Sequence, residues 1–308
     1  MQIEAYRQKR IDLAMASDVA RREHQMFRVL RPTVAGLSIV LVASILGAGG
    51  LAFSATSGAT VTGTLTAPNQ PGGLDHFLCY KASGVAGGPT FAVPPGVLLQ
   101  NALDPGGFVP VIGKIAAHCN PATKILPSGL AFPPNSPSWH LACLKIAAAQ
   151  QSQTVVVSNQ FGRGTLVTKS PNQFCLPSLK SLTGASGFKP PAATEIQPDH
   201  FTCYPVSYVK KAPKFTPPPG VMVSDQFSPA AAVAVTLGNP KSLCVPTQKT
   251  LPTTPPTVFP ITNHNANLLC FAVSPTPTLP AVWDSNQFGI GQLAIRTTKT
   301  LCLPSFLG

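Results

Sequence analysis

The chain has 308 residues, of which 34 are prolines and only 10% are charged. This composition argues against a helical bundle, because proline breaks helix interiors and solvated helix faces need charge. The 44% hydrophobic content is enough to bury a core, which argues against disorder. The net charge of +12 is scattered, without the basic stripe and interleaved aromatic residues that a nucleic-acid surface needs, so no specific nucleic-acid partner is expected.

The N-terminal part of the chain predicts export. Residues 34–55 carry no charge and are long enough to cross a bilayer, and the arginines before them place residues 1–33 in the cytoplasm. Residues 34–55 are either a cleaved signal peptide or an uncleaved anchor helix that holds the protein on the membrane. Translation from Met26 instead of Met1 would give a signal peptide of ordinary length. Residues 56–74, rich in Thr, Gly, Ala and Pro, are expected to form a flexible linker.

The rest of the chain repeats one pattern four times. In each unit, a short segment that carries a cysteine, such as Asp199–Tyr204, is followed later in the chain by a Cys-x-Pro segment. The two cysteines of successive units are 40, 32, 41 and 32 residues apart, so the units form a doublet that was then duplicated. The expected domains are a first doublet at 75–182 with units 75–127 and 138–182, a linker at 183–197, and a second doublet at 198–308 with units 198–250 and 263–308.

Each unit contains short apolar runs bounded by Pro-rich loops, which predicts short antiparallel strands. Three or four such strands in one unit cannot make a stable core alone, so two units are expected to pack face to face. The predicted fold is therefore mainly β, with each doublet forming a sandwich or a small barrel stapled by disulfides. Residues 34–55 are the one helix expected.

The eight cysteines are even in number and follow the predicted export segment, which favours disulfides. Spacing alone does not prove the connectivity, but each duplicated unit could inherit one bridge intact. Each bridge would contribute about 3–4 kcal/mol in the chain-entropy treatment. The pairs expected on this basis are Cys79 with Cys119, Cys143 with Cys175, Cys203 with Cys244, and Cys270 with Cys302.

Metal binding is the alternative, because His76, His140 and His200 each stand three residues before a cysteine. In a strand, this odd separation puts the two side chains on opposite faces. The chain has no C-x-x-C motif, and paired cysteines are not thiolate ligands. We therefore expect no metal or other cofactor, and we place the histidines on the outer face of the strands or at the contact between units.

A recurring turn supplies further candidate binding residues. An Asn or Asp is followed by Gln and Phe in three units, and the histidines are the remaining candidates for contact with a ligand. The competing interpretation is structural, because Asn and Asp cap turns with their own side chains and the phenylalanines would fill the core. The structural interpretation is favoured. The turn residues concerned are Asn159, Gln160, Asp225, Gln226, Asn286 and Gln287.

The sequence assigns no catalytic residue. The exported part has few carboxylates, and Asp75 and Asp199 are matching copies that repeat the strand pattern. No nucleophile elbow, zinc-protease motif or phosphate-binding loop is present.

Seven segments carry a resemblance: His76–Lys81, Asn159–Gly162, Phe174–Pro177, Asp199–Tyr204, Leu243–Pro246, Asn286–Gly289 and Leu301–Pro304. With these motifs the chain resembles an uncharacterised family of exported repeat modules found in bacterial and environmental sequences. The resemblance covers about residues 75–308, although the first unit lacks the Asn-Gln-Phe turn and the fourth lacks the histidine. It implies secretion and modular β structure, and no activity comes with it.

These observations predict an exported, non-enzymatic binding or structural module of the cell surface or extracellular space. Its partner would be an extracellular ligand or an envelope component. A secreted hydrolase or carbohydrate-active enzyme is the alternative, and a groove lined by Asp75 or Asp199 with a nearby histidine would indicate it. A third interpretation is an envelope metal-binding protein, which free thiols would indicate.

Overall fold

The computed structural model describes residues 73–185, 198–228, 232–274 and 281–308. The expected cytoplasmic segment at 1–33, the apolar segment at 34–55, and most of the linkers at 56–74 and 183–197 lie outside these residues. The described part is mainly β, with 17 strands. It includes no helix of the length and hydrophobicity that crossing a bilayer would require.

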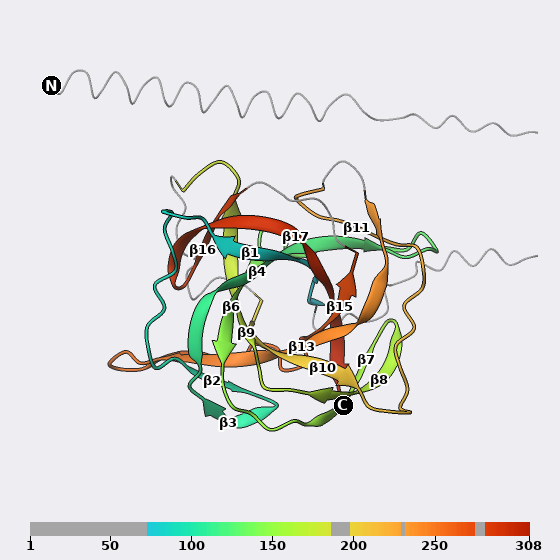
Figure 1. The fold of residues 1–308 in the computed structure, drawn as a ribbon, viewed down its shortest axis with the longest axis horizontal. Coiled ribbons are helices and arrows are strands. Elements are labelled where there is room, and N and C mark those ends of the chain that lie inside the picture. The colour runs from blue at the N-terminus through green and yellow to red at the C-terminus, as the bar shows by residue number, and fades with distance from the viewer. Residues whose placement is uncertain (1–72, 186–197, 229–231, 275–280) are drawn as a thin grey trace, which may run out of the picture. The chain divides into compact units, whose positions relative to one another are not determined.

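Eight of the strands form a closed antiparallel barrel, seen as a ring in Figure 1. Each barrel strand pairs with the next barrel strand along the chain, and the last pairs with the first, where Phe77 faces Cys302. Every unit contributes two of these strands, one for each of its cysteines. The barrel strands are β1 (His76–Gly84), β4 (Val111–Ile125), β6 (His140–Ala147), β9 (Gln173–Ser181), β10 (His200–Tyr208), β13 (Leu237–Leu251), β15 (Asn267–Val273) and β17 (Gly289–Leu307).

An outer layer of four hairpins covers the barrel, one hairpin from each unit. They are β2 (Leu98–Asn101) with β3 (Asp104–Phe108), β7 (Thr154–Asn159) with β8 (Gly162–Thr168), β11 (Val221–Ser224) with β12 (Val233–Val235), and β16 (Val282–Asn286) with the start of β17. Each hairpin pairs with the second cysteine strand of the unit two places away: β2 with β13, β7 with β17, β11 with β4, and β16 with β9. Two short strands, β5 (Ala131–Phe132) and β14 (Thr257–Phe259), pair antiparallel with the C-terminal ends of β4 and β13.

The structure differs from the expectation of a separate sandwich or small barrel in each doublet. The two doublets share one barrel, joined through the β9–β10 and β17–β1 pairings, and their hairpins are exchanged. The physical reason is edge pairing, because four strands alone would leave two open edges with unpaired backbone groups. Closing eight strands removes every edge and leaves an interior that side chains or one small ligand can fill.

Alternation along the barrel strands, shifted at a bulge in β4, creates two cores. In β1, Phe77 and Cys79 face the lumen, whereas Leu78 and Tyr80 face outward beneath the hairpins. The inner core contains the eight cysteines and a few apolar residues, and the larger outer core lies between barrel and hairpins. Because both faces of the barrel strands are buried, the sequences of these strands are nearly continuous apolar runs.

Candidate functional site

All eight cysteines face the lumen and encircle it at one level. The disulfides join Cys79–Cys119, Cys143–Cys175, Cys203–Cys244 and Cys270–Cys302, as expected, and no cysteine of the described residues is free. Neighbouring bridges are in contact through non-bonded Sγ atoms. These Sγ–Sγ distances are 3.6 Å for Cys79 and Cys302, 4.0 Å for Cys119 and Cys143, 3.7 Å for Cys175 and Cys203, and 4.0 Å for Cys244 and Cys270. The result is a closed ring of eight sulfur atoms, the sulfur ring, built into the barrel wall.

The sulfur ring lines a cavity of about 260 Å³. Leu141, Phe201 and Leu268 add apolar surface to it. Its polar lining comes from the start of β9 with the residue before it, and from the β13 and β17 strands: Asn172, Gln173, Lys241, Ser242, Lys299 and Thr300. The cavity therefore combines a polarisable, apolar body with a polar side.

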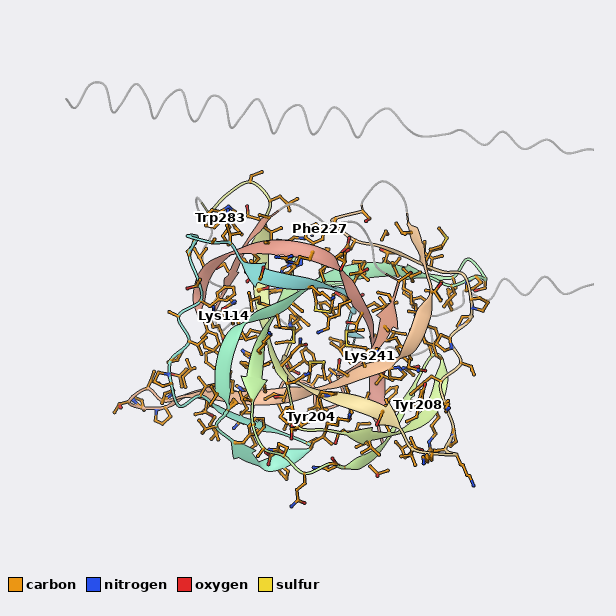
Figure 2. All side chains as sticks on the ribbon, viewed as in Figure 1. Lys114, Tyr204, Tyr208, Phe227, Lys241 and Trp283 are labelled. Carbon is orange, nitrogen blue, oxygen red and sulfur yellow. A yellow bond between two sulfur atoms is a disulfide. The ribbon has the colours of Figure 1, made fainter. Side chains whose placement is uncertain are left out.

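Exposed lysines mark the end where this cavity meets solvent. Lys241 and Lys299 line it, and Figure 2 labels Lys241 beside the ring of barrel strands. Partial burial lowers the pKa of Lys299, and the positive charges of Lys81 and Lys145 lower it further. No carboxylate is among the residues that line the cavity. The local field at this end therefore favours an anion.

A second cavity, of about 220 Å³, is lined by both Asp75 and Asp199. The Asp75 carboxylate accepts hydrogen bonds from the backbone N–H groups of Asn135 (2.6 Å) and Ser136 (2.9 Å). Asp199 accepts matching bonds from the loop before β15. Burial raises the pKa of Asp75, although these backbone bonds oppose the shift. Both carboxylates thus anchor loops, and no histidine is among the residues that line this cavity.

The three predicted histidines lie on the outer face of the barrel, apart from the cysteine sulfurs. His76 accepts a hydrogen bond from Gln160 (2.9 Å), and His200 bonds to Gln287 (2.9 Å). His140 stacks on the ring of His118 at 5.4 Å between centroids. Burial lowers the pKa of all three, that of His200 to about 3, with a further contribution from nearby lysines.

The histidines and cysteines therefore do not form a common metal site. Disulfide formation also removes the cysteines from the set of thiolate ligands. Within the described ranges, no three His, Cys, Asp or Glu side chains are grouped so as to hold a metal ion.

The Asn/Asp residues of the predicted turns cap those turns. The side-chain oxygens of Asn159, Asp225 and Asn286 each accept a hydrogen bond from the backbone N–H two residues later, at 2.8, 2.9 and 2.8 Å. Gln226, unlike Gln160 and Gln287, is exposed and donates to the Pro137 carbonyl.

The first unit keeps this turn in a form that sequence reasoning missed. Asn101 Oδ1 accepts a hydrogen bond from the Leu103 N–H (2.9 Å), so Ala102 and Leu103 replace the Gln and Phe of the other turns. The detectable signal was an Asn two residues before an apolar residue.

Lysines that are fully buried (Lys124 and Lys249) or half-buried (Lys180) form a second feature of the outer core. Lys124, Lys180 and Lys249 each stand five residues after a cysteine and lie over a phenylalanine ring, 4.0–4.1 Å from its centroid. Burial lowers their pKa to about 7, 8 and 7 respectively. This spacing is visible in the sequence, but by itself it does not assign a role to the lysines.

Beneath the β11–β12 hairpin, a buried polar cluster also escaped sequence reasoning. Asn120 bonds to both Lys180 and Asp225, and His118 bonds to Asn120 and to Asp284. The detectable signal was the residue between Cys and Pro, which is Asn120 in the first unit. The other three units have Leu176, Val245 and Leu303 there.

Comparisons with protein-family models, with curated proteins and with solved structures find no match. The resemblance to exported repeat modules therefore stays a prediction, and the geometry alone must support a function.

Proposed function

We propose that the protein is an exported, non-enzymatic binding module whose barrel lumen holds a small organic anion. The observation that carries this proposal is the cavity bounded by the sulfur ring, with lysines where it meets solvent. The apolar body of the ligand would lie against the disulfides and Phe201. Its anionic group would lie near Lys241 and Lys299.

The size of the cavity supports a small ligand. Eight-stranded barrels have an interior that is either filled by side chains or wide enough for one small molecule. Here the cysteine side chains are short, and a volume of about 260 Å³ is left open. A water molecule takes about 30 Å³ in the liquid, so there is room for roughly nine groups of that size. A carboxylic acid of six to eight carbons, or an aromatic acid, matches this volume.

The chemistry of the wall supports the same class of ligand. Disulfide sulfur is polarisable and nearly apolar, so it favours alkyl or aromatic groups over charged ones. The lysines favour an anion at the open end, and the lining residues include no acidic side chain that would oppose it. The four disulfides fix the wall in place and are consistent with an extracellular or exported protein.

Titration calorimetry with hexanoate, octanoate and benzoate tests the proposal. At least one of them should bind with a stoichiometry of one, and hexanol and hexylammonium should bind more weakly. The Lys241→Gln/Lys299→Gln variant should lose about tenfold in affinity, which is about 1.4 kcal/mol. The matched control is Arg163→Gln/Lys210→Gln, which removes two exposed charges that do not line the cavity.

Two results would overturn the proposal. If none of the three carboxylates binds at millimolar concentration, the lumen is not a site for organic anions. If they bind equally well to the wild type and to the Lys241/Lys299 variant, the lysines are not the anion site.

A further inference from the structure

The buried polar cluster beneath the β11–β12 hairpin contains two residues whose types are not repeated at the matching positions of the other three units. Its carboxamide, Asn120, stands where the others have Leu176, Val245 and Leu303, and its carboxylate, Asp225, stands where the others have Asn101, Asn159 and Asn286. Asn120 is fully buried and Asp225 is only 9% exposed. Because buried polar groups are costly, an isolated set of them in one of four similar places needs an explanation.

We propose that Lys180 and Asn120 form an intramolecular isopeptide bond, with Asp225 as the catalytic acid and base and ammonia as the leaving group. The proposal is independent of the lumen and its ligand. It rests on the contacts of three side chains and on the way the rest of the cluster holds them.

The nucleophile and the carboxamide are already in contact. Lys180 Nζ lies 2.9 Å from Asn120 Oδ1. Because a C=O bond is about 1.2 Å long, Asn120 Cγ lies no farther than roughly 4 Å from Nζ. A small rotation of either side chain would bring the two atoms to the roughly 3–3.5 Å of a near-attack arrangement.

The surroundings of Lys180 favour the neutral amine that such an attack requires. The amine lies 4.0 Å from the centre of the ring of Phe227, which is labelled in Figure 2. Burial lowers the pKa of Lys180 to about 8, and the carboxylates of Asp225 and Asp284 oppose this shift. A fraction of the amine of this half-buried lysine is therefore uncharged near neutral pH.

Asn120 is held as an electrophile. Its Nδ2 donates a hydrogen bond to Asp225 Oδ2 (2.9 Å), which places the carboxyl group beside the nitrogen that would leave. His118 Nε2 lies 3.0 Å from Asn120 Oδ1, where the N–H of the imidazolium form, whose other N–H would donate to Asp284, would stabilise the oxyanion that forms during attack. His118 Nδ1 lies 2.9 Å from Asp284 Oδ2, and Ser178 donates to the same oxygen (3.0 Å). Asp284 and Ser178 are thus positioning residues for His118.

The reaction balances without any co-reactant. The Lys180 ammonium first gives one proton to the Asp225 carboxylate, and the neutral amine then attacks Asn120 Cγ. A new bond forms between Nζ and Cγ as the Cγ–Nδ2 bond breaks. Asp225 returns its proton to Nδ2 and accepts one from the attacking nitrogen, so that ammonia leaves. The product is a secondary amide between β9 and β4, and the ammonia carries away the displaced nitrogen.

The other two buried lysines serve as internal comparisons. Lys124 Nζ has no hydrogen-bond partner within the described part of the chain. Lys249 contacts the Gln287 carboxamide, but the neighbouring turn residue there is Asn286, which cannot act as an acid. Only Lys180 has both a carboxamide and a carboxylate in place, so we expect one cross-link and not three.

Mass spectrometry of the full chain, produced with its cysteines oxidised and then denatured, reduced and alkylated, tests the proposal. The wild type should weigh one ammonia less than its sequence. After digestion, the Lys180 peptide should stay uncleaved at that residue and be joined to the peptide that contains Asn120. Locating the loss in this joined peptide separates it from ammonia loss elsewhere.

Asp225→Asn is the matched control. Asparagine already caps the equivalent turn at 101, 159 and 286, so this variant keeps the cap and removes only the acid. It should keep its full mass and yield linear peptides, as should Lys180→Arg. Linear Lys180 and Asn120 peptides from the wild type would overturn the proposal whether or not the variants fold. A cross-link in Asp225→Asn would overturn the role of Asp225.

Discussion

Replacing Lys124 by methionine should stabilise the protein at neutral pH. The Lys124 side chain is fully buried, and its amine has no hydrogen-bond partner among the described residues. Its one favourable contact is with aromatic rings, the nearest being Phe132 at 4.1 Å from the centroid. Methionine has a similar length, keeps the aromatic contact through its sulfur, and removes the buried charge.

The size of the gain follows from the pKa of Lys124, which burial lowers from 10.5 to about 7. At 1.36 kcal/mol per pKa unit, the charged form is disfavoured in the folded state by about 5 kcal/mol. The cation–π contact offsets about 2 kcal/mol of this, so the net gain is about 3 kcal/mol at pH 7. For a chain of this size, that corresponds to a midpoint of thermal unfolding higher by roughly 6–12 °C.

The pH dependence gives the sharper assay. Between the folded pKa of about 7 and the unfolded value of 10.5, the unfolded state binds more protons at this site. The stability contributed at this site therefore rises with pH through this window. The advantage of Lys124→Met, measured by urea unfolding of both proteins from pH 7 to 10.5, should shrink steadily as pH rises.

Lys249→Met is the matched control for this prediction. It removes an equally buried lysine at the same place in the third unit, but also a hydrogen bond to Gln287. The increase in unfolding free energy on Lys249→Met should be about 1 kcal/mol smaller than the increase on Lys124→Met. A Lys124→Met protein that is less stable than the wild type at pH 7, or an advantage that does not change with pH, would refute the reasoning.

Three further outcomes are expected. Without reductant, no cysteine of the protein produced in an oxidising compartment should react with iodoacetamide, and any labelled cysteine would contradict the four bridges. Gly164→Ala should lower the unfolding free energy by about 1–3 kcal/mol, because the added Cβ would lie 2.5 Å from the Phe215 ring; Gly106→Ala, where the nearest atom is 3.8 Å away, should be nearly neutral. Tyr80→Phe should cost about 2 kcal/mol in chemical unfolding, because it removes the 2.9 Å hydrogen bond to the buried Asp225; an unchanged midpoint would count against that bond.

The sequence predicted the features that depend on local pattern. The cysteine pairs follow from the repeated units, and the outward position of His76 follows from its odd separation from Cys79. The turn at Asn159 is likewise a local matter, because the side chain bonds to the backbone two residues later. These features need no knowledge of which strands meet.

The shared barrel could not be predicted in this way. The β9–β10 and β17–β1 pairings join strands from different doublets, and spacing along the chain does not record such contacts. The same limit applies to the polar cluster, since Asn120 and Asp225 are 105 residues apart and meet only because β11 pairs with β4. One feature of the sequence does indicate the polar cluster: among the four Cys-x-Pro segments, one has Asn at the middle position.

The exchange of hairpins has a consequence for how such a barrel could arise. A chain that held one doublet would have four barrel strands with two open edges, and two hairpins whose partner strands are missing. It could satisfy both only by combining with a second copy of itself, each copy lending its hairpins to the other. The β9–β10 and β17–β1 pairings would then correspond to the two halves of a symmetric dimer interface, here contained within one polypeptide.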